Sequence, residues 1–232
     1  MKKENKEKLE ELLKAANDTI QGVDPGAQGG VIRATKGKLL EDLCKELVKI
    51  AWGELDGNPA DLSFSGKKID IPIKREYIQK VKTRKEEVGD WIENNIDDFI
   101  FKAQVDVHAM IKGDFVLGIE CKAYTENAML KRILVDFSLL KSKYPHLKCA
   151  LLQLESQLTG DYCEIDKSII YGSHSSHTLM SLFDIDLHIM TLLKGERKVD
   201  EPIHKKKFFK PLLLENAEKV IRQIMELLRE YK

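Results

Sequence analysis

Residues 106–123 read DVHAMIKGDFVLGIECKA, and this stretch decides the fold because two alternating apolar patterns meet in it around a turn. Before the turn, the odd positions are apolar from Phe101 to Ile111. After the turn, the odd positions are apolar again from Phe115 to Cys121. Directly opposed residues of an antiparallel pair share one face of a sheet. The pattern therefore predicts a β-hairpin with an apolar face and a second face that carries the polar even positions.

The length of the turn determines which side chains meet across this hairpin. A two-residue turn at Gly113-Asp114 would pair apolar with polar positions and bury the charges. A three-residue turn, Lys112-Gly113-Asp114, keeps the apolar face intact. We therefore expect the three-residue turn, which sets Asp106 opposite Glu120.

The even face of the hairpin then gathers chemically reactive groups. Two opposed carboxylates repel each other unless a positive charge lies between them. Mg²⁺ prefers oxygen ligands, so we expect Asp106, Glu120 and the backbone carbonyl of Cys121 to hold a magnesium ion. Lys122 lies on the same face, as His108 does, and could orient or deprotonate the attacking water. These residues predict phosphodiester hydrolysis, and the alternative is a solvated polar face without chemistry.

The remaining periodicities predict one α/β domain over residues 1–232. Helices are expected at 3–21, 36–53, 86–99, 125–144 and 211–231, with strands at 148–155 and 182–193. An edge strand or extended arm is expected at 67–85, and loops at 22–30 and 156–178. The helix at 125–144 completes a β-α-β unit, and we expect it to cover the apolar face of the hairpin.

The spacing Asp106-x13-Glu120-x-Lys122 on a hairpin, followed by a helix and a strand, resembles the PD-(D/E)XK nuclease superfamily. Size and layout are most similar to type II restriction endonucleases. The resemblance covers about residues 36–155 and implies a restriction-endonuclease-like core, a mixed β-sheet flanked by helices. It departs from the family pattern at Val105, where proline is usual. An upstream helix of this family often carries a glutamate that faces the metal, and Glu41 fits that position.

The resemblance also implies an activity and partners. It implies Mg²⁺-dependent cleavage of double-stranded DNA at a short specific sequence, with 5′-phosphate ends. It further implies a homodimer, because a palindromic site matches a two-fold protein, and a cognate DNA methyltransferase that forms no stable complex. The helix at 3–21 and the C-terminal part, 156–232, would serve recognition or dimerisation. The alternatives are a repair nuclease or junction resolvase of this superfamily, or a non-catalytic DNA-binding module.

Basic and polar residues outside the hairpin are candidates for DNA contacts. The formal net charge is zero, yet residues 67–85 hold eight lysines and arginines against two acids. Basic side chains bind phosphates, whereas Ser and His can contact base edges. The candidates are Arg33, Lys36, Lys74, Arg75, Lys82, Arg84, Ser173, His174, Ser175, Ser176 and His177.

Two other patterns could bind metal. Asp184, Asp186 and His188 alternate on one expected strand, but no lysine accompanies them, so an exposed or groove-lining strand face is favoured. His174 and His177 have zinc-like spacing in a serine-rich segment that lacks helical periodicity. We therefore prefer the hairpin site to either of them.

Cysteine usage and hydropathy narrow the class of protein. Cys44, Cys121, Cys149 and Cys163 lie far apart and form no C-x-x-C pair, which favours buried free thiols over zinc. No apolar run approaches the roughly 18 residues that span a bilayer, and no signal core follows the lysine-rich N-terminus. We expect a cytoplasmic protein without membrane contact.

Overall fold

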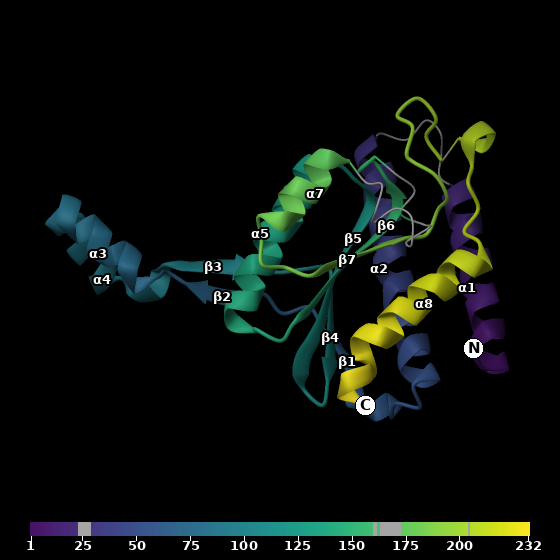
Figure 1. The fold of residues 1–232 in the computed structure, drawn as a ribbon, viewed down its shortest axis with the longest axis horizontal. Coiled ribbons are helices and arrows are strands. Elements are labelled where there is room, and N and C mark those ends of the chain that lie inside the picture. The colour runs from purple at the N-terminus through teal and green to yellow at the C-terminus, as the bar shows by residue number, and fades with distance from the viewer. Residues whose placement is uncertain (23–28, 160–161, 163–172, 204) are drawn as a thin grey trace.

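A five-stranded sheet runs through the centre of the molecule, between two layers of helices (Figure 1). The structure is a computed structural model that describes residues 1–22, 29–159, 162, 173–203 and 205–232. Within 29–36 it describes the backbone alone. No helix in these ranges is long and apolar enough to cross a membrane.

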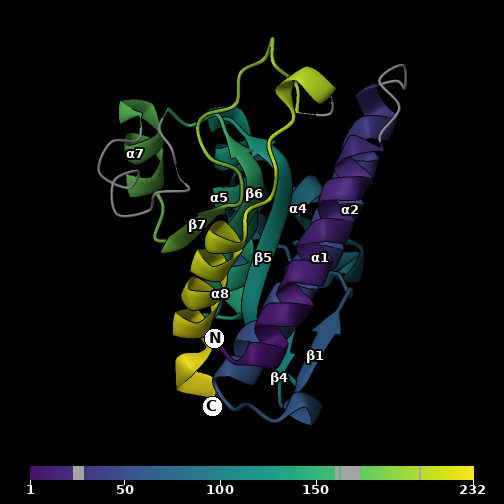
Figure 2. The same cartoon turned by 90° about the vertical axis from the view of Figure 1, so that its right-hand side faces the viewer.

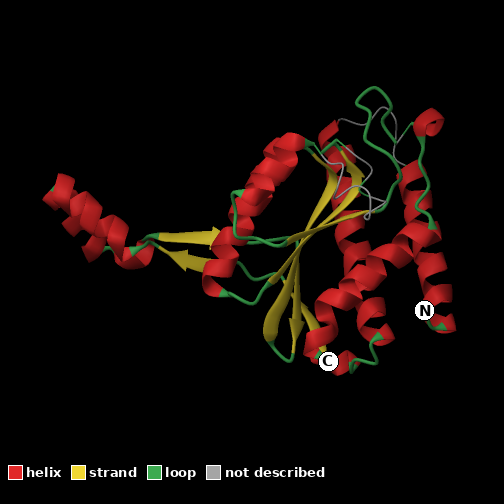
Figure 3. Cartoon of the chain, viewed as in Figure 1, coloured by secondary structure: helices red, strands yellow, loops and turns green. Residues whose placement is uncertain are grey.

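The central sheet is mixed. Its strands, in spatial order, are β1 (Leu62–Ser65), β4 (Val107–Ile111), β5 (Asp114–Thr125), β6 (Lys148–Ser156) and β7 (Leu187–Thr191). Pairing is antiparallel from β1 through β4 to β5, and parallel from β5 through β6 to β7. Helix α5 (Asn127–Lys143) joins β5 to β6 as a β-α-β unit (Figure 3). The predicted α/β fold, a mixed sheet flanked by helices, is confirmed.

One face of the sheet is covered by three helices from both ends of the chain (Figure 2). These are α1 (Lys3–Gln21), α2 (Gly29–Glu54) and α8 (Leu214–Leu228). Leu9 of α1, Leu47 of α2 and Ile224 of α8 are fully buried in one core with Leu117 and Ile119 of β5. The N-terminal and C-terminal helices therefore share their core with the central sheet.

The other face is covered by α5 and α7 (His174–Ser181). The prediction that α5 covers the apolar odd face of the hairpin is wrong. The odd-numbered Leu117 packs beneath α2 and α8, whereas Phe137 of α5 approaches the even-numbered Gly118, where an added Cβ would lie 3.0 Å from its ring. A β-α-β crossover has a fixed hand, so the side on which β6 joins the sheet decides which face α5 covers.

The hairpin turn also differs from the prediction. Ile111 pairs with Asp114, so the turn has two residues, Lys112 and Gly113, both with positive φ (51° and 89°). An extra residue on β5 between Phe115 and Leu117 then shifts the register, so that Val107 pairs with Ile119 as predicted. The three-residue turn is wrong, but the bulge restores the register that it was meant to provide.

A projecting arm, residues 69–103, interrupts the predicted first strand (Figure 1). It contains β2 (Ile69–Pro72), α3 (Arg75–Arg84), α4 (Glu86–Asn94), a 3-10 turn (Ile96–Asp98) and β3 (Ile100–Ala103). β3 pairs with β2 rather than continuing into β4. The extended arm expected at 67–85 is therefore right for β2 and wrong for α3. The close packing of α4 on α3 supports the helix, since an added Cβ at Gly89 would lie 2.1 Å from Lys82 Cγ.

The stretch expected as a loop at 156–178 contains the start of α7. Ser173 caps this helix, because its Oγ accepts a hydrogen bond from the Ser176 backbone N at 3.0 Å. Residues 160–161 and 163–172 of that stretch lie outside the described ranges. At the C-terminus, α8 begins at Leu214, so Pro211 precedes the helix rather than forming its first turn.

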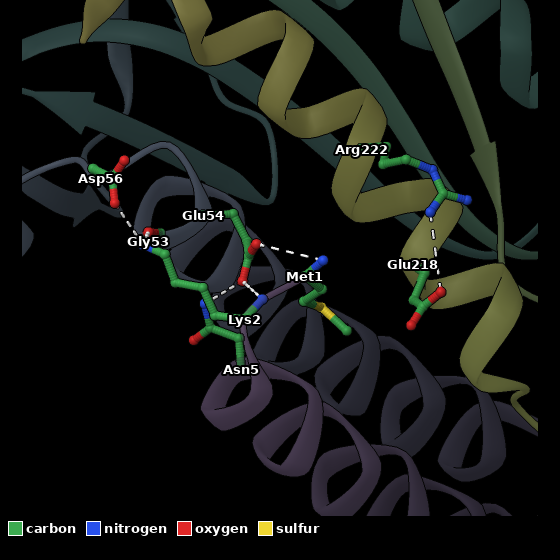
Figure 4. A network of polar contacts seen from close by, with 8 residues as sticks. All are labelled: Met1, Lys2, Asn5, Gly53, Glu54, Asp56, Glu218 and Arg222. Carbon is green, nitrogen blue, oxygen red and sulfur yellow. Dashed lines mark hydrogen bonds and ion pairs between the residues drawn. The ribbon is translucent and has the colours of Figure 1, made fainter.

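The two chain ends meet beside the C-terminal end of α2, and Figure 4 shows the N-terminal part of this contact. Glu54 Oε1 accepts hydrogen bonds from the Lys2 backbone N at 2.8 Å and from Asn5 Nδ2 at 2.6 Å, and Glu54 Oε2 lies 3.9 Å from the Met1 α-amino group. Asp56 pairs with Lys2 Nζ at 2.7 Å and with Lys232 Nζ at 3.7 Å. We call these six residues the terminal clasp.

Candidate active site

The predicted hairpin site lies where β4 begins beside the middle of β5. Glu120, Cys121 and Lys122 are on β5, and Asp106 directly precedes β4. The Val107–Ile119 pair places Asp106 across from Glu120, as the sequence predicts. Asp106 Oδ2 is fixed to the other strand because it accepts a hydrogen bond from the Cys121 backbone N at 2.7 Å.

The Lys122 ammonium lies among the three predicted metal ligands. Its Nζ is 2.5 Å from Glu120 Oε1, 3.3 Å from Asp106 Oδ2 and 3.2 Å from the backbone O of Cys121. Two carboxylates and a carbonyl therefore converge on one positively charged group. The ammonium here occupies the place of a cation among hard oxygen donors.

The electrostatics of this cluster leave it short of positive charge. Burial raises the pKa of Glu120, and the charge of Asp106 adds to the rise, although Lys122 opposes it. Burial alone would lower the pKa of Lys122, but the charges of Glu120 and Asp106 outweigh this effect and raise it. On α5, burial raises the pKa of Asp136, which adds a further acid near Glu120. The site therefore favours either protonation or another cation.

Glu41 reaches the same site from α2, as predicted. It lines a pocket of ≈ 230 Å³ together with Asp106, Lys122, Tyr124 and Met129. Burial raises the pKa of Glu41, and the negative charge of Asp106 raises it further. The prediction that this helix presents a carboxylate to the hairpin site is consistent with this position.

The oxygen donors suit Mg²⁺ in kind, since hard divalent cations take carboxylate and carbonyl ligands. Within the described part of the chain, no three His, Cys, Asp or Glu side chains converge tightly enough to form a metal site. At the hairpin, the Lys122 ammonium lies between Asp106 and Glu120. These oxygen donors match Mg²⁺ in chemical type, and in this structure the ammonium takes the position between them.

Comparisons with known proteins place this chain in a family. No protein-family model matches the chain. The type II restriction enzyme DdeI of Desulfomicrobium norvegicum is 52% identical over 209 residues, which cover 89% of this chain and 86% of that enzyme. The chain belongs to the type II restriction enzymes. The predicted resemblance to this family is thereby confirmed.

Two weaker similarities accompany this match. A ribosome-recycling factor of Macrococcus caseolyticus is 32% identical over 108 residues, which cover 47% of this chain and 54% of that factor. Among solved structures, the native BbvCI A2B2 tetramer at low resolution is 13% identical, with a TM-score of 0.39 over 97% of this chain and 90% of that chain.

His108 does not join the site of the restriction enzyme, although the sequence places it there. Only 1% of it is exposed, and its ring stacks on Phe115 with 4.5 Å between centroids. Its Nε2 accepts a hydrogen bond from the Val105 backbone N at 3.3 Å. Burial lowers the pKa of His108. At this position the even face lies against α5, so His108 serves as a core residue.

The predicted DNA contacts of the arm lie on α3, away from the strands β4 and β5 that carry the hairpin site (Figure 1). Lys74, Arg75 and Arg84 are exposed at the ends of α3. Lys82 is instead held by two acids of α4, with Nζ 2.8 Å from Asp90 Oδ1 and 2.6 Å from Glu93 Oε2. Its place at the helix–helix contact makes it a structural lysine in this structure.

The other predicted DNA contacts have mixed outcomes. Arg33 and Lys36 lie in the part of α2 where side chains are outside the description. Ser176 is buried and donates to Asn127 Oδ1 at 2.6 Å, while Ser175 Oγ accepts from Asn127 Nδ2 at 2.7 Å. Ser175 and Ser176 thus tie α7 to α5, and Ser173 caps α7. His174 is exposed and His177 is partly exposed.

Among the residues that the structure describes, the rival metal patterns gain no further ligand. Asp186 Oδ2 lies 3.3 Å from His188 Nε2, and Asp184 precedes β7 rather than belonging to it. Cys44, Cys121 and Cys149 are buried free thiols, as predicted, and Cys163 lies outside the described residues. A hydrogen bond to Cys44, together with burial, raises the pKa of the Cys121 thiol. Both thiols therefore belong to the contact between α2 and β5.

Three residues at the site of the restriction enzyme were missed. Tyr124 is the next even position on β5 after Lys122, so the alternation alone could have placed it there. Asp136 and Met129 come from α5. Their positions depend on the face that α5 covers, and the sequence analysis assigned that face incorrectly.

Proposed function

We propose that this restriction enzyme hydrolyses double-stranded DNA at a short specific sequence, with Mg²⁺ as cofactor and the PD-(D/E)XK set Asp106, Glu120 and Lys122 as its catalytic residues. The observation that carries the proposal is the convergence of Asp106 Oδ2, Glu120 Oε1 and the Cys121 carbonyl on one ammonium. The 52% identity to the type II restriction enzyme DdeI supports it.

Each residue has a role that follows from its position. Asp106, Glu120 and the Cys121 carbonyl would hold Mg²⁺, and Glu41 would assist from α2 as an outer or second-metal ligand. When bound, Mg²⁺ would supply charge neutralisation at the scissile phosphate and lower the pKa of water. Lys122 lines the pocket, and its side chain stays protonated because its pKa is raised. It would orient the attacking water and stabilise negative charge as that charge develops.

The proposed products and partners follow from the same reading. Hydrolysis would leave 5′-phosphate ends. A homodimer would match a palindromic site by its two-fold symmetry. A cognate DNA methyltransferase of the same system would protect that site in the host without forming a stable complex with this enzyme.

The decisive experiment is incubation of plasmid DNA with the purified chain in Mg²⁺ and, separately, in a chelator. Discrete fragments that appear only with Mg²⁺ support a specific endonuclease, and ligation of the fragments would establish 5′-phosphate ends. A smear indicates a nonspecific nuclease. Intact DNA that is nevertheless bound indicates a binding module.

Two matched variants connect the activity to the hairpin. Asp106→Asn removes one charge at the site, and Asp186→Asn makes the same change at the rival pattern on the far sheet edge. Loss of cleavage in the first variant alone supports the hairpin site. Loss in the second alone would move the site to β7.

A further inference from the structure

A cation outside the predicted set lies against the wall of the active site. Tyr124 lines the pocket with Glu41 and Lys122. The guanidinium of Arg197 stacks over its ring, with Cζ 3.7 Å from the ring centroid. Arg197 belongs to a segment far along the chain, between β7 and α8. The fold therefore brings a positive charge into contact with a residue that lines the pocket.

Several contacts hold Arg197 in this position. Its backbone N donates to the Ser156 carbonyl at 2.7 Å, and Glu196 forms a β-bridge with Ser156. Its Nη1 donates to Gln157 Oε1. The side chain is thus fixed at both ends, by the end of β6 and by the Tyr124 ring. An arginine held in this way loses little conformational freedom when it binds a further group.

The charge of Arg197 is uncompensated in the described structure. A second cation at the same sheet edge, Lys210, has its Nζ 2.9 Å from Glu155 Oε1, and Glu155 is only 4% exposed. Across the described ranges, no acidic side chain lies within ion-pair distance of Arg197. A guanidinium has five N–H donors, and Gln157 takes one of them. The remaining donors suit an anion that accepts two hydrogen bonds.

We propose that Arg197 binds a phosphate of the DNA strand next to the scissile phosphate, and that Tyr124 is its positioning residue. Tyr124 is two residues from Lys122 on the same strand face, a separation of about 7 Å. Successive phosphates of one strand can therefore meet Lys122 and Arg197 in turn. Arginine favours this contact because its planar fork matches two phosphate oxygens. The inference rests on the proposed function, since it extends the same DNA-binding site.

The test measures the salt dependence of DNA binding. The cleavage site is first mapped from plasmid fragments, and a duplex containing it is titrated in Ca²⁺ at several salt concentrations. Each phosphate contact contributes about 0.9 to the slope of log K against log salt. Arg197→Ala should lower the slope by about 0.9 and weaken binding roughly tenfold at low salt. Arg197→Lys should restore the slope, because it restores the charge.

Two further variants keep the test independent of folding. Arg197→Gln removes the charge and retains a polar side chain, so it should lower the slope as Arg197→Ala does, even if the alanine variant unfolds. Lys198→Ala is the matched control, because Lys198 is exposed and has its Nζ 3.3 Å from Glu201 Oε2. It should leave the slope and the affinity unchanged.

The outcomes separate the two proposals. If the wild-type enzyme binds and cuts DNA but Arg197→Gln and Arg197→Ala retain its salt slope, Arg197 is a structural residue and this inference is overturned alone. If the slope falls equally in Lys198→Ala, the effect is a general loss of charge, and the inference also fails. If the wild-type enzyme neither binds nor cuts duplex DNA, both proposals fall.

Discussion

The terminal clasp and the hairpin site both bring carboxylates and cations together, and they are built differently. At the clasp, Glu54 and Asp56 face three cations, the Met1 α-amino group and the side chains of Lys2 and Lys232. A hydrogen bond from Lys2 and the positive charges around it lower the pKa of Asp56. Asp56 is therefore stabilised in its charged form.

At the hairpin site, the balance is reversed. Glu41, Asp106 and Glu120 surround Lys122, and burial raises the pKa of both glutamates. Their charged forms are therefore destabilised by the fold. The contrast separates charges that hold the structure together from charges arranged to receive a ligand, because an unsatisfied negative cluster gains most from a bound cation.

The largest expected effect comes from the carboxylate at the centre of the hairpin site. Glu120→Ala should reduce cleavage in Mg²⁺ by about a thousandfold or more, because it removes a ligand oxygen and a fixed charge beside the scissile phosphate. The melting temperature should not fall, since the change also removes a destabilised charge. Plasmid cleavage and a thermal melt on the same sample would measure both effects. Cutting at the wild-type rate would exclude the hairpin as the active site.

Lys122→Ala tests whether the Lys122 ammonium takes part in the chemical step or only attracts DNA. We expect a loss of about a hundredfold or more in single-turnover rate, the scale seen when one group that stabilises developing negative charge is removed. Binding of the same DNA in Ca²⁺ should be retained. Single-turnover cleavage and a binding titration would decide between the two roles. A weakened affinity with an unchanged saturating rate would mean that Lys122 acts by attraction alone.

Glu41→Gln should have a smaller effect on turnover. Glu41 approaches the pocket from α2, so its loss is expected to reduce the rate by about ten- to a hundredfold, as changes around a metal site commonly do. DNA affinity should stay nearly the same. Rates at several Mg²⁺ concentrations would show whether the loss is recovered at high Mg²⁺. A rate equal to that of the wild type would assign Glu41 to the surface.

Glu54→Ala should produce the opposite pattern at the clasp. Glu54 accepts hydrogen bonds from Lys2 and Asn5, so its loss should lower the free energy of unfolding by about 1–3 kcal/mol. Cleavage at 25 °C should be unchanged. Glu7→Ala is the control, because Glu7 forms only an exposed pair with Lys3 and should have little effect. A cleavage defect in Glu54→Ala at full folding would show that the clasp is linked to catalysis.

The smallest effects concern pH, and the two clusters should respond with opposite signs. A raised pKa means that ionised Glu120 costs stability at pH values above its unfolded pKa of about 4.5. Glu120→Gln should therefore raise the melting temperature of the metal-free protein at pH 7, and the gain should vanish toward pH 4. The lowered pKa of Asp56 means that its charge stabilises the fold above about pH 3.8.

Asp56→Asn should accordingly lower the melting temperature slightly at pH 7, and the loss should disappear as pH falls below about 3.8. Melts of both variants and the wild type from pH 3.5 to pH 8, with a chelator present, would test the pair. Shifts of the same sign in the two variants would contradict the distinction between the clusters.

The register that sets Asp106 across from Glu120 could be predicted, because both strands of the hairpin alternate between apolar and polar residues. A shift of one residue would bury the charged positions, so the apolar set leaves one register. The turn could not be predicted by the same argument. The Lys112-Gly113 turn is one residue shorter than predicted, and the extra residue on β5 after Phe115 makes up the difference in register. The alternation of apolar residues shows only the final register, so it cannot tell this arrangement from a three-residue turn.

Features that depend on distant partners were predicted less well. His108 has the polar character of a site residue, but its surroundings are decided by the face that α5 covers. Helix α3 is rich in charged residues and buries only Ile78, so its apolar pattern is too weak to indicate a helix. Arg197 is separated from Lys122 by most of the C-terminal half, and no local pattern connects them.

The base of the projecting arm has a consequence for protein engineering. Ile69 and Ala103 are paired across β2 and β3, so the chain leaves and rejoins the body at one point. Insertions with adjoining ends of this kind are the ones that proteins accept and exchange most readily. Val105 lies two positions after Ala103 and is buried in the core beneath α5, and Asp106 follows it directly. A graft of a different arm should therefore be joined beyond the Ile71–Phe101 pair, which leaves the chain that leads to Asp106 unchanged.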